Sequence, residues 1–417
     1  MTLVLALAAM LVASPALAQT SQAQASEPAP RTYPFIVLDS PAHYFTMRQV
    51  NQDYLSLFRL YSDTLNTHLK PSLSFLIQGA SCVILFKTMT HEEGHRAVLT
   101  SEGIYSVARP LLFGERHGYV DSVTDASLQD LRDTKFPTYA HVHTAGTESD
   151  YMLATREETL MAFDDERYKN LVVDYLLRKG GIIFYFTEGL VHRNTDGPEE
   201  ADELDRDIVG NDIYGVIRHW YRPDMEFTRY TRLEDLTSAE RGYLDRIQWR
   251  TFLNLANANV IGVQNFRLTD HVKANVGMAH SLSPFGDFID ERAWFVYRGS
   301  LKTSAYVREF ENRDHWYFGA GAGIYDYRLT SRLSGSATVH YWNQPTGLSF
   351  TADTGKSGGA IDVDARYRIM PRWNSRMDSV SIDVGMIYKT EGFLPEEVVL
   401  SDHFGVRVGF SVGLRPH

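Results

Sequence analysis

The sequence predicts an α+β protein in which a mostly helical segment precedes an antiparallel β-barrel of about eight strands. The hydrophobic periodicity changes near residue 260, from helical spacing to strict alternation. Aromatic residues make up 12% of the chain, with 23 tyrosines, which is typical of many strands or of a membrane-interface belt. The length of 417 residues favours two domains over one.

Composition and charge restrict the classes of partner. Hydrophobic residues are 44% and charged residues 22%, which is typical of a globular protein. The net charge of −11 is spread without a basic block, so nucleic acid is not an expected partner. The sequence contains neither a phosphate-binding loop nor a dinucleotide fingerprint after a strand, so no nucleotide is expected either.

The first residues indicate export. Residues 1–18 read as a signal peptide, with an apolar run and an Ala16-Leu17-Ala18 cleavage signal, although no Lys or Arg precedes the run. Residues 19–31 are rich in Gln, Ser, Ala and Pro and are expected to form a flexible linker. Cys82 is the one cysteine, so no internal disulfide forms, and its apolar neighbours predict a buried thiol.

A mostly helical domain is expected to span residues 32–257. The segment 71–86 is strongly apolar but contains Gln78, so we expect a core helix rather than a transmembrane one. Thr237 and Glu240 have the spacing of a capping box at the start of the last helix. The expected helices are 44–69, 71–86, 149–163, 166–177, 211–220 and 238–255.

The C-terminal β-barrel is expected to span residues 258–417. In the segment 359–369, Ile361 and Val363 alternate with Asp362 and Asp364, which suits a bilayer outside and a polar lumen inside. We therefore expect contact with lipid in the outer membrane of a diderm bacterium; a soluble periplasmic β-sandwich is the alternative. The expected strands are 272–278, 294–298, 302–308, 316–325, 333–341, 359–369, 380–388 and 404–414.

One motif carries chemistry, namely His91-Glu92-Glu93-Gly94-His95. Residues four apart lie on one face of a helix, so His91 and His95 can direct both imidazoles at one metal ion. Glu92 then lies beside a metal-activated water and can serve as the catalytic general base. The alternative is a charged helix end whose histidines only pack or form hydrogen bonds.

This motif resembles the active-site helix of zincin metallopeptidases over ten to twenty residues. The resemblance implies a Zn²⁺ cofactor, a peptide or protein substrate and hydrolysis of an amide bond. The extended motif of the metzincins is missing after His95, whereas the gluzincins place a glutamate ligand on a second helix. In a gluzincin-like site Glu148 is the best third ligand, and Asp150 would orient His91 or His95 from the second shell.

Other residues compete for these roles. His141 and His143 are alternative third ligands, since alternate positions of an extended segment point the same way, and Glu102 is a further possibility. Tyr151 and His219 are of the right type to stabilise a transition-state oxyanion, although His219 also suits an ordinary helix position.

The sequence thus predicts an exported zinc-dependent hydrolase, a metallopeptidase attached to the outer membrane. One alternative is a non-enzymatic outer-membrane barrel with a helical periplasmic or plug domain and at most a structural metal. A further alternative is a zinc hydrolase that acts on amide bonds of lipids or the cell wall.

Overall fold

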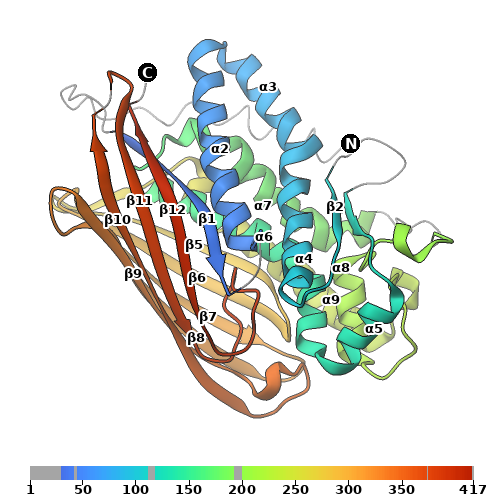
Figure 1. The fold of residues 1–417 in the computed structure, drawn as a ribbon. Coiled ribbons are helices and arrows are strands. Elements are labelled where there is room, and N and C mark those ends of the chain that lie inside the picture. The colour runs from blue at the N-terminus through green and yellow to red at the C-terminus, as the bar shows by residue number, and fades with distance from the viewer. Residues whose placement is uncertain (1–29, 42–44, 111–117, 192–199, 373, 416–417) are drawn as a thin grey trace.

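A computed structural model describes residues 30–41, 45–110, 118–191, 200–372 and 374–415. The expected signal peptide (1–18) and nearly all of the expected linker (19–31) lie outside these residues. The described chain is α+β: a broad, curved antiparallel sheet carries the helices against one of its faces (Figure 1).

Side-chain caps mark the start of several helices. Thr46 and Asn211 accept hydrogen bonds from the backbone N–H groups of Gln49 and Tyr214, and the capping box of Thr237 and Glu240 is confirmed. The helices are α2 (Met47–His68), α3 (Pro71–Ser81), the π-helical turn η1 (Cys82–Phe86), α4 (Lys87–Ser101), α5 (Asp125–Thr134), α6 (Phe136–Ala162), α7 (Tyr168–Val191), α8 (Asp212–Tyr221) and α9 (Ser238–Arg250). Short 3₁₀ turns are η2 (Glu203–Asp205), η3 (Leu233–Asp235), η4 (Thr251–Leu255), η5 (Ala258–Ile261) and η6 (Thr346–Leu348).

Within the described residues, ten strands form the large sheet in the order β1-β12-β11-β10-β9-β8-β7-β6-β5-β4. They are β1 (Arg31–Ser40), β4 (Phe266–Thr269), β5 (Val272–Ser283), β6 (Gly286–Tyr297), β7 (Leu301–Glu311), β8 (Trp316–Arg328), β9 (Leu333–Pro345), β10 (Gly355–Pro371), β11 (Met377–Lys389) and β12 (His403–Leu414). A separate pair consists of β2 (Val107–Arg109) and β3 (Tyr119–Asp121).

The expected closed barrel of eight strands is wrong in two respects. The eight expected strands are present as β5 to β12, but β1 and β4 extend the sheet at its two ends. These two strands are the edges of the sheet and do not pair with each other, so the sheet is not closed. β1 comes from the segment expected to begin the helical domain, and it pairs with β12 at the other end of the chain.

The helices and the sheet share one hydrophobic core. Trp220 on α8 stacks on Phe350 with ring centroids 5.1 Å apart, and Tyr151 on α6 packs edge-on against Phe288 of β6. Residues of α7 and α9 join the same cluster. This cluster therefore contains residues from both sides of the boundary expected near residue 257.

The outer face of the sheet is apolar and exposed. Strand register aligns Ile361, Tyr388 and Phe404 in one row across β10, β11 and β12, and these side chains are 54%, 56% and 58% exposed. On the same strands, Asp362 and Arg407 face the helices; Arg407 is buried and Asp362 is half-buried. The polarity is therefore the reverse of that in a soluble sheet, in which apolar side chains face the core.

The α3 helix has the same inverted polarity. Ser74 and Gln78 are buried and hydrogen bond to each other, whereas Leu73 and Leu76 are exposed. The expectation of a core helix at 71–86 is wrong, because its apolar side chains face outward and its polar ones face inward. Among the described residues, the run Pro71–Ser101 is the one helix long and apolar enough to cross a membrane, by length and composition alone.

Candidate metal centre

The centre is built where α4 crosses α6 at close range. A Cβ atom at Gly94 of α4 would lie 2.5 Å from the carbonyl oxygen of Ala145, so glycine permits this approach. A Cβ atom at Gly146 of α6 would overlap the Nε2 atoms of both His91 and His95. The helix crossing therefore leaves a small space in front of the two imidazoles, as a metal ion requires.

Hydrogen bonds fix both imidazole rings. His91 Nδ1 lies 3.0 Å from Asp150 Oδ2, and His95 Nδ1 lies 2.5 Å from the carbonyl oxygen of Val142. Because a carbonyl oxygen and a carboxylate accept, the two Nδ1 atoms carry the protons and donate. The Nε2 atoms are then the atoms that can bind a metal ion, and both face the space beside Gly146.

Asp212 supplies the third donor. Its Oδ2 atom lies 3.2 Å from Nε2 of His91 and 3.2 Å from Nε2 of His95. Bonds of about 2.0–2.2 Å in a tetrahedral arrangement place donor atoms roughly this far apart. His91, His95 and Asp212 are all buried, and this group could hold a metal ion. Two imidazoles and one carboxylate are a donor set typical of catalytic zinc.

Asp212 occupies the first turn of α8. The residue before it, Asn211, caps the helix by accepting from Tyr214 N at 3.0 Å. Gly210 has φ +60°, and this left-handed turn brings the chain into the helix. The partial positive charge of the helix N-terminus favours an ionised carboxylate at Asp212.

The structure replaces Glu148 with Asp212 as the third candidate ligand. Both carboxylate oxygens of Glu148 are engaged elsewhere, by His141 Nε2 at 2.7 Å and by Glu396 N at 2.7 Å. The reason is helical phase: α6 begins at Phe136, so Glu148 and Asp150 lie on roughly opposite sides of one helix. Asp150 faces His91, and Glu148 therefore faces away.

The alternative ligands are also placed elsewhere. The segment of His141 and His143 is helical and not extended, so the two side chains diverge. His141 contacts Glu148, and His143 packs beside Gly215 and the ring of His219. Glu102 forms an ion pair with Lys135 at 2.6 Å.

Of the expected supporting residues, Asp150 is at the centre and two are not. Asp150 contacts His91 as predicted, and Arg178 Nη1 donates to its Oδ1 atom at 2.8 Å. Tyr151 instead hydrogen bonds to Asp290 on β6, facing the sheet. His219 is buried and lies 3.0 Å from the hydroxyl of Tyr139.

Two further residues line the centre. The hydroxyl of Tyr185 on α7 lies 3.3 Å from Asp212 N, and its ring packs edge-on against His91. Asp207 is half-buried near Glu92 and Asp212. Its burial raises its pKa most, and the negative charges of Glu92 and Asp212 raise it further.

Sequence reasoning missed Asp212, Asp207 and Tyr185. The Gly210-Asn211-Asp212 sequence, a turn and cap followed by a carboxylate at a helix start, was the available signal.

The surroundings raise the pKa values of His91, His95 and Glu92 for different reasons. Burial alone would lower the pKa of His91, but Asp150 and Asp212 raise it to about 10. Burial opposes protonation of His95 as well, and Asp212 raises its pKa. Burial raises the pKa of Glu92, which favours a group that must accept and release a proton.

Comparison with known proteins gives no assignment. No family model matches the sequence, and no curated protein matches it. The function is therefore argued from the residues of the site.

We expect Asp212→Ala to lower the affinity for zinc, the metal that this donor set favours, by more than about a hundredfold, because it removes one of the three candidate ligands. Loss of a supporting residue costs about 10–100-fold. Glu148→Gln should leave zinc content unchanged, because Glu148 faces His141. Mass spectrometry of the metal in both purified variants makes the measurement. Zinc retained by Asp212→Ala but lost from Glu148→Gln would contradict the proposed ligand set.

Metal uptake should release protons. His91 has a pKa raised to about 10, so it carries a proton at neutral pH, and only the neutral imidazole binds a metal. The apparent zinc affinity should therefore rise as the pH rises from neutral toward this pKa. Isothermal titration calorimetry in buffers of different ionisation enthalpy measures the number of protons released; a binding enthalpy that is independent of the buffer would refute the expectation.

Proposed function

We propose that this protein is a zinc-dependent hydrolase of amide bonds, a metallopeptidase, in which His91, His95 and Asp212 hold the metal. The convergence of three buried donor atoms on one point, with Glu92 next to the first ligand on the same helix, carries this proposal. A purely structural site has no use for a buried carboxylate at Glu92 that does not join the donor set.

The residues of the chain supply the remaining chemistry. A bound zinc ion would acidify a water molecule and polarise a carbonyl group. Glu92 accepts a proton from the attacking water and returns it to the leaving nitrogen. Asp150, held by Arg178, keeps His91 in the tautomer that presents Nε2. Tyr185, whose hydroxyl lies 3.3 Å from Asp212 N, is the candidate donor to the oxyanion, a role expected of Tyr151 or His219.

Glu92→Gln tests the enzyme directly. The variant should keep its zinc, since Glu92 is not a ligand, and lose about 10²–10⁴-fold in turnover, since an amide cannot accept the proton. Activity is measured as cleavage of a mixed fluorogenic peptide library by wild type and variant.

Glu93→Gln is the matched control for this experiment. Glu93 neighbours Glu92 in the same motif but pairs with Arg96 at the surface of α4, so its variant should keep full activity. Equal cleavage by wild type and Glu92→Gln would refute the role of Glu92 as the base, and absence of cleavage by the zinc-loaded wild type would favour the non-enzymatic alternative with a structural metal.

We propose further that the protein is exported and that the outer face of the sheet contacts the lipid of an outer membrane. The support is the reversed polarity of the sheet and of α3. Strands β5 to β12 have 11–17 residues each, long enough for a bilayer core, for which about 9–11 tilted residues suffice. Export rests on the signal-peptide pattern at residues 1–18.

The double variant Ile361→Arg/Met386→Arg tests the lipid contact. Each arginine on a lipid-facing strand costs about 2–4 kcal/mol at mid-bilayer, so the variant should leave the urea-washed membrane pellet in which wild type remains. Leu204→Arg/Tyr105→Arg is the control, because these residues are also exposed, at 45% and 75% against 54% and 47% for Ile361 and Met386, but lie outside the sheet. Recovery of the wild type in the soluble fraction would refute the lipid contact.

A further inference from the structure

A cavity of about 1170 Å³ lies between the inner face of the sheet and the helices α2 and α6. Its walls are strongly cationic: thirteen arginine and lysine side chains line it, against eight carboxylates. The whole chain has the opposite balance, with 41 basic and 52 acidic residues. The cations are therefore concentrated at this place by the fold.

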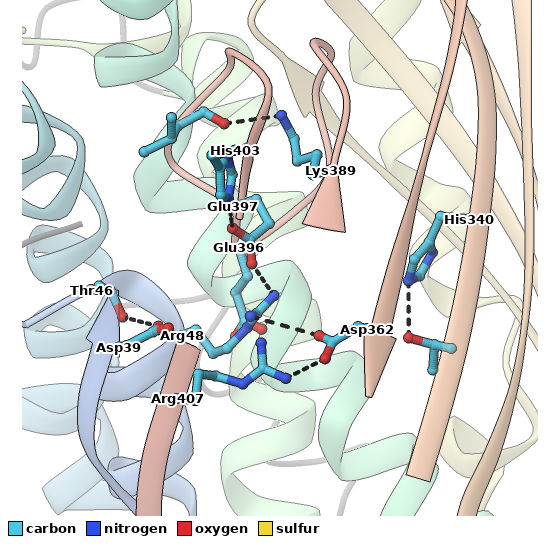
Figure 2. Close-up of polar contacts among 12 residues, drawn as sticks. Asp39, Thr46, Arg48, His340, Asp362, Lys389, Glu396, Glu397, His403 and Arg407 are labelled. Atoms are coloured by element: carbon cyan, nitrogen blue, oxygen red, sulfur yellow. Dashed lines mark hydrogen bonds and ion pairs between the residues drawn. The ribbon is translucent and has the colours of Figure 1, made fainter. Parts of the chain in front are cut away.

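The deep part of the cavity contains buried arginines that are not fully paired. Arg48 of α2 and Arg407 of β12 both point toward Asp362 of β10 (Figure 2). Both arginines are more than nine-tenths buried, and the Nη1 atom of each has no hydrogen-bond partner in the described chain. A buried guanidinium N–H without an acceptor is costly, so these atoms favour an anionic or strongly accepting ligand.

Three further arginines of the cavity lining lie near the turn between β8 and β9. Arg328 ends β8, Arg332 lies in the following turn, and Arg368 lies on β10. The register brings them together, because Arg368 N donates to Arg332 O at 2.8 Å and Arg328 lies opposite Ser334. None of the three forms an ion pair within the described residues, in contrast to their neighbour Arg366, which pairs with Asp326 and Asp383.

We propose that this cavity binds a phosphate-bearing anion through Arg328, Arg332 and Arg368. Guanidinium groups bind phosphate oxygens with two parallel hydrogen bonds, and three adjacent guanidinium groups match a ligand with several negative charges. Hydroxyl groups of Ser334, Ser336 and other wall residues supply further donors for such oxygens. The site lies on the far side of α6 from His91 and His95 and does not depend on the metal centre.

The chemistry of the walls excludes other ligand classes. A metal cation would meet an excess of positive charge, and more than half of the lining residues are charged or carry a hydroxyl group, which disfavours an apolar ligand. The phosphate can belong to a soluble molecule or to a lipid headgroup, because Arg328 lies at the end of β8 in a sheet whose outer face is apolar and exposed. The experiment below distinguishes these sources.

Binding of inorganic pyrophosphate to the detergent-solubilised full-length protein is measured by isothermal titration calorimetry, at low and at moderate ionic strength. The variant Arg328→Gln/Arg332→Gln/Arg368→Gln should bind at least about tenfold more weakly, a loss of about 1.4 kcal/mol. It should fold normally, since it breaks no ion pair; circular dichroism checks this.

The matched control is Arg232→Gln/Arg267→Gln/Arg298→Gln, which removes the same charge from exposed residues outside the cavity. Its affinity should stay within about twofold of wild type; an equal loss in both triple variants would overturn the proposal.

Flotation with phosphatidylcholine vesicles, with and without phosphatidylglycerol, tests the lipid source. A phosphatidylglycerol-dependent gain that only the cavity variant loses would assign a headgroup. Absence of both pyrophosphate binding and this gain would overturn the site.

Discussion

The close crossing of α4 and α6 is the constraint on which the metal centre depends. Val142, Gly146 and Asp150 are spaced four residues apart, so they form one stripe along α6. Val142 holds His95, Asp150 holds His91, and Gly146 between them leaves the space that both Nε2 atoms face. The hydroxyl of Ser149 donates to Thr90 O at 2.8 Å and ties the two helices together beside this stripe. One face of α6 thus orients both histidines, and a shift of either helix would separate the histidines from their hydrogen-bond partners on α6.

Charge explains why this place suits a divalent cation. Asp150 is balanced by Arg178, and Lys87 lies 3.3 Å from it. Asp212, Glu92 and Asp207 are less fully balanced: Asp212 contacts both histidines, and the same histidines are the nearest cations to Glu92. Asp207 accepts a hydrogen bond from Val120 N. Burial and mutual repulsion raise the pKa values of Glu92 and Asp207, and the carboxylates raise those of the histidines. Protons on the two histidines can balance these carboxylates. A divalent ion can replace the protons while it neutralises the same carboxylates.

Sequence alone predicted the local parts of this arrangement. The spacing of His91, Glu92 and His95 is set within one helical turn, and the period of two identified eight strands. The third ligand depends on where α8 lies against α4, which no local pattern encodes, so Asp212 was missed. Glu148 was chosen because a helix start was expected beside it; with α6 beginning at Phe136, its phase directs Glu148 to His141. Pairing of β1 with β12 joins the two ends of the chain and had no local signal either.

The reversed polarity links the sheet, the cavity and the helices. Where apolar side chains face outward, the inside must contain the polar ones, and each needs a partner. Most inner arginines are satisfied by carboxylates, as Arg366 is by Asp326 and Asp383. Arg328, Arg332 and Arg368 depart from this pattern although carboxylates line the same cavity. Pairing these arginines as well would satisfy internal neutrality, so the lack of an ion pair at the three, among the described residues, favours a ligand that supplies the negative charge.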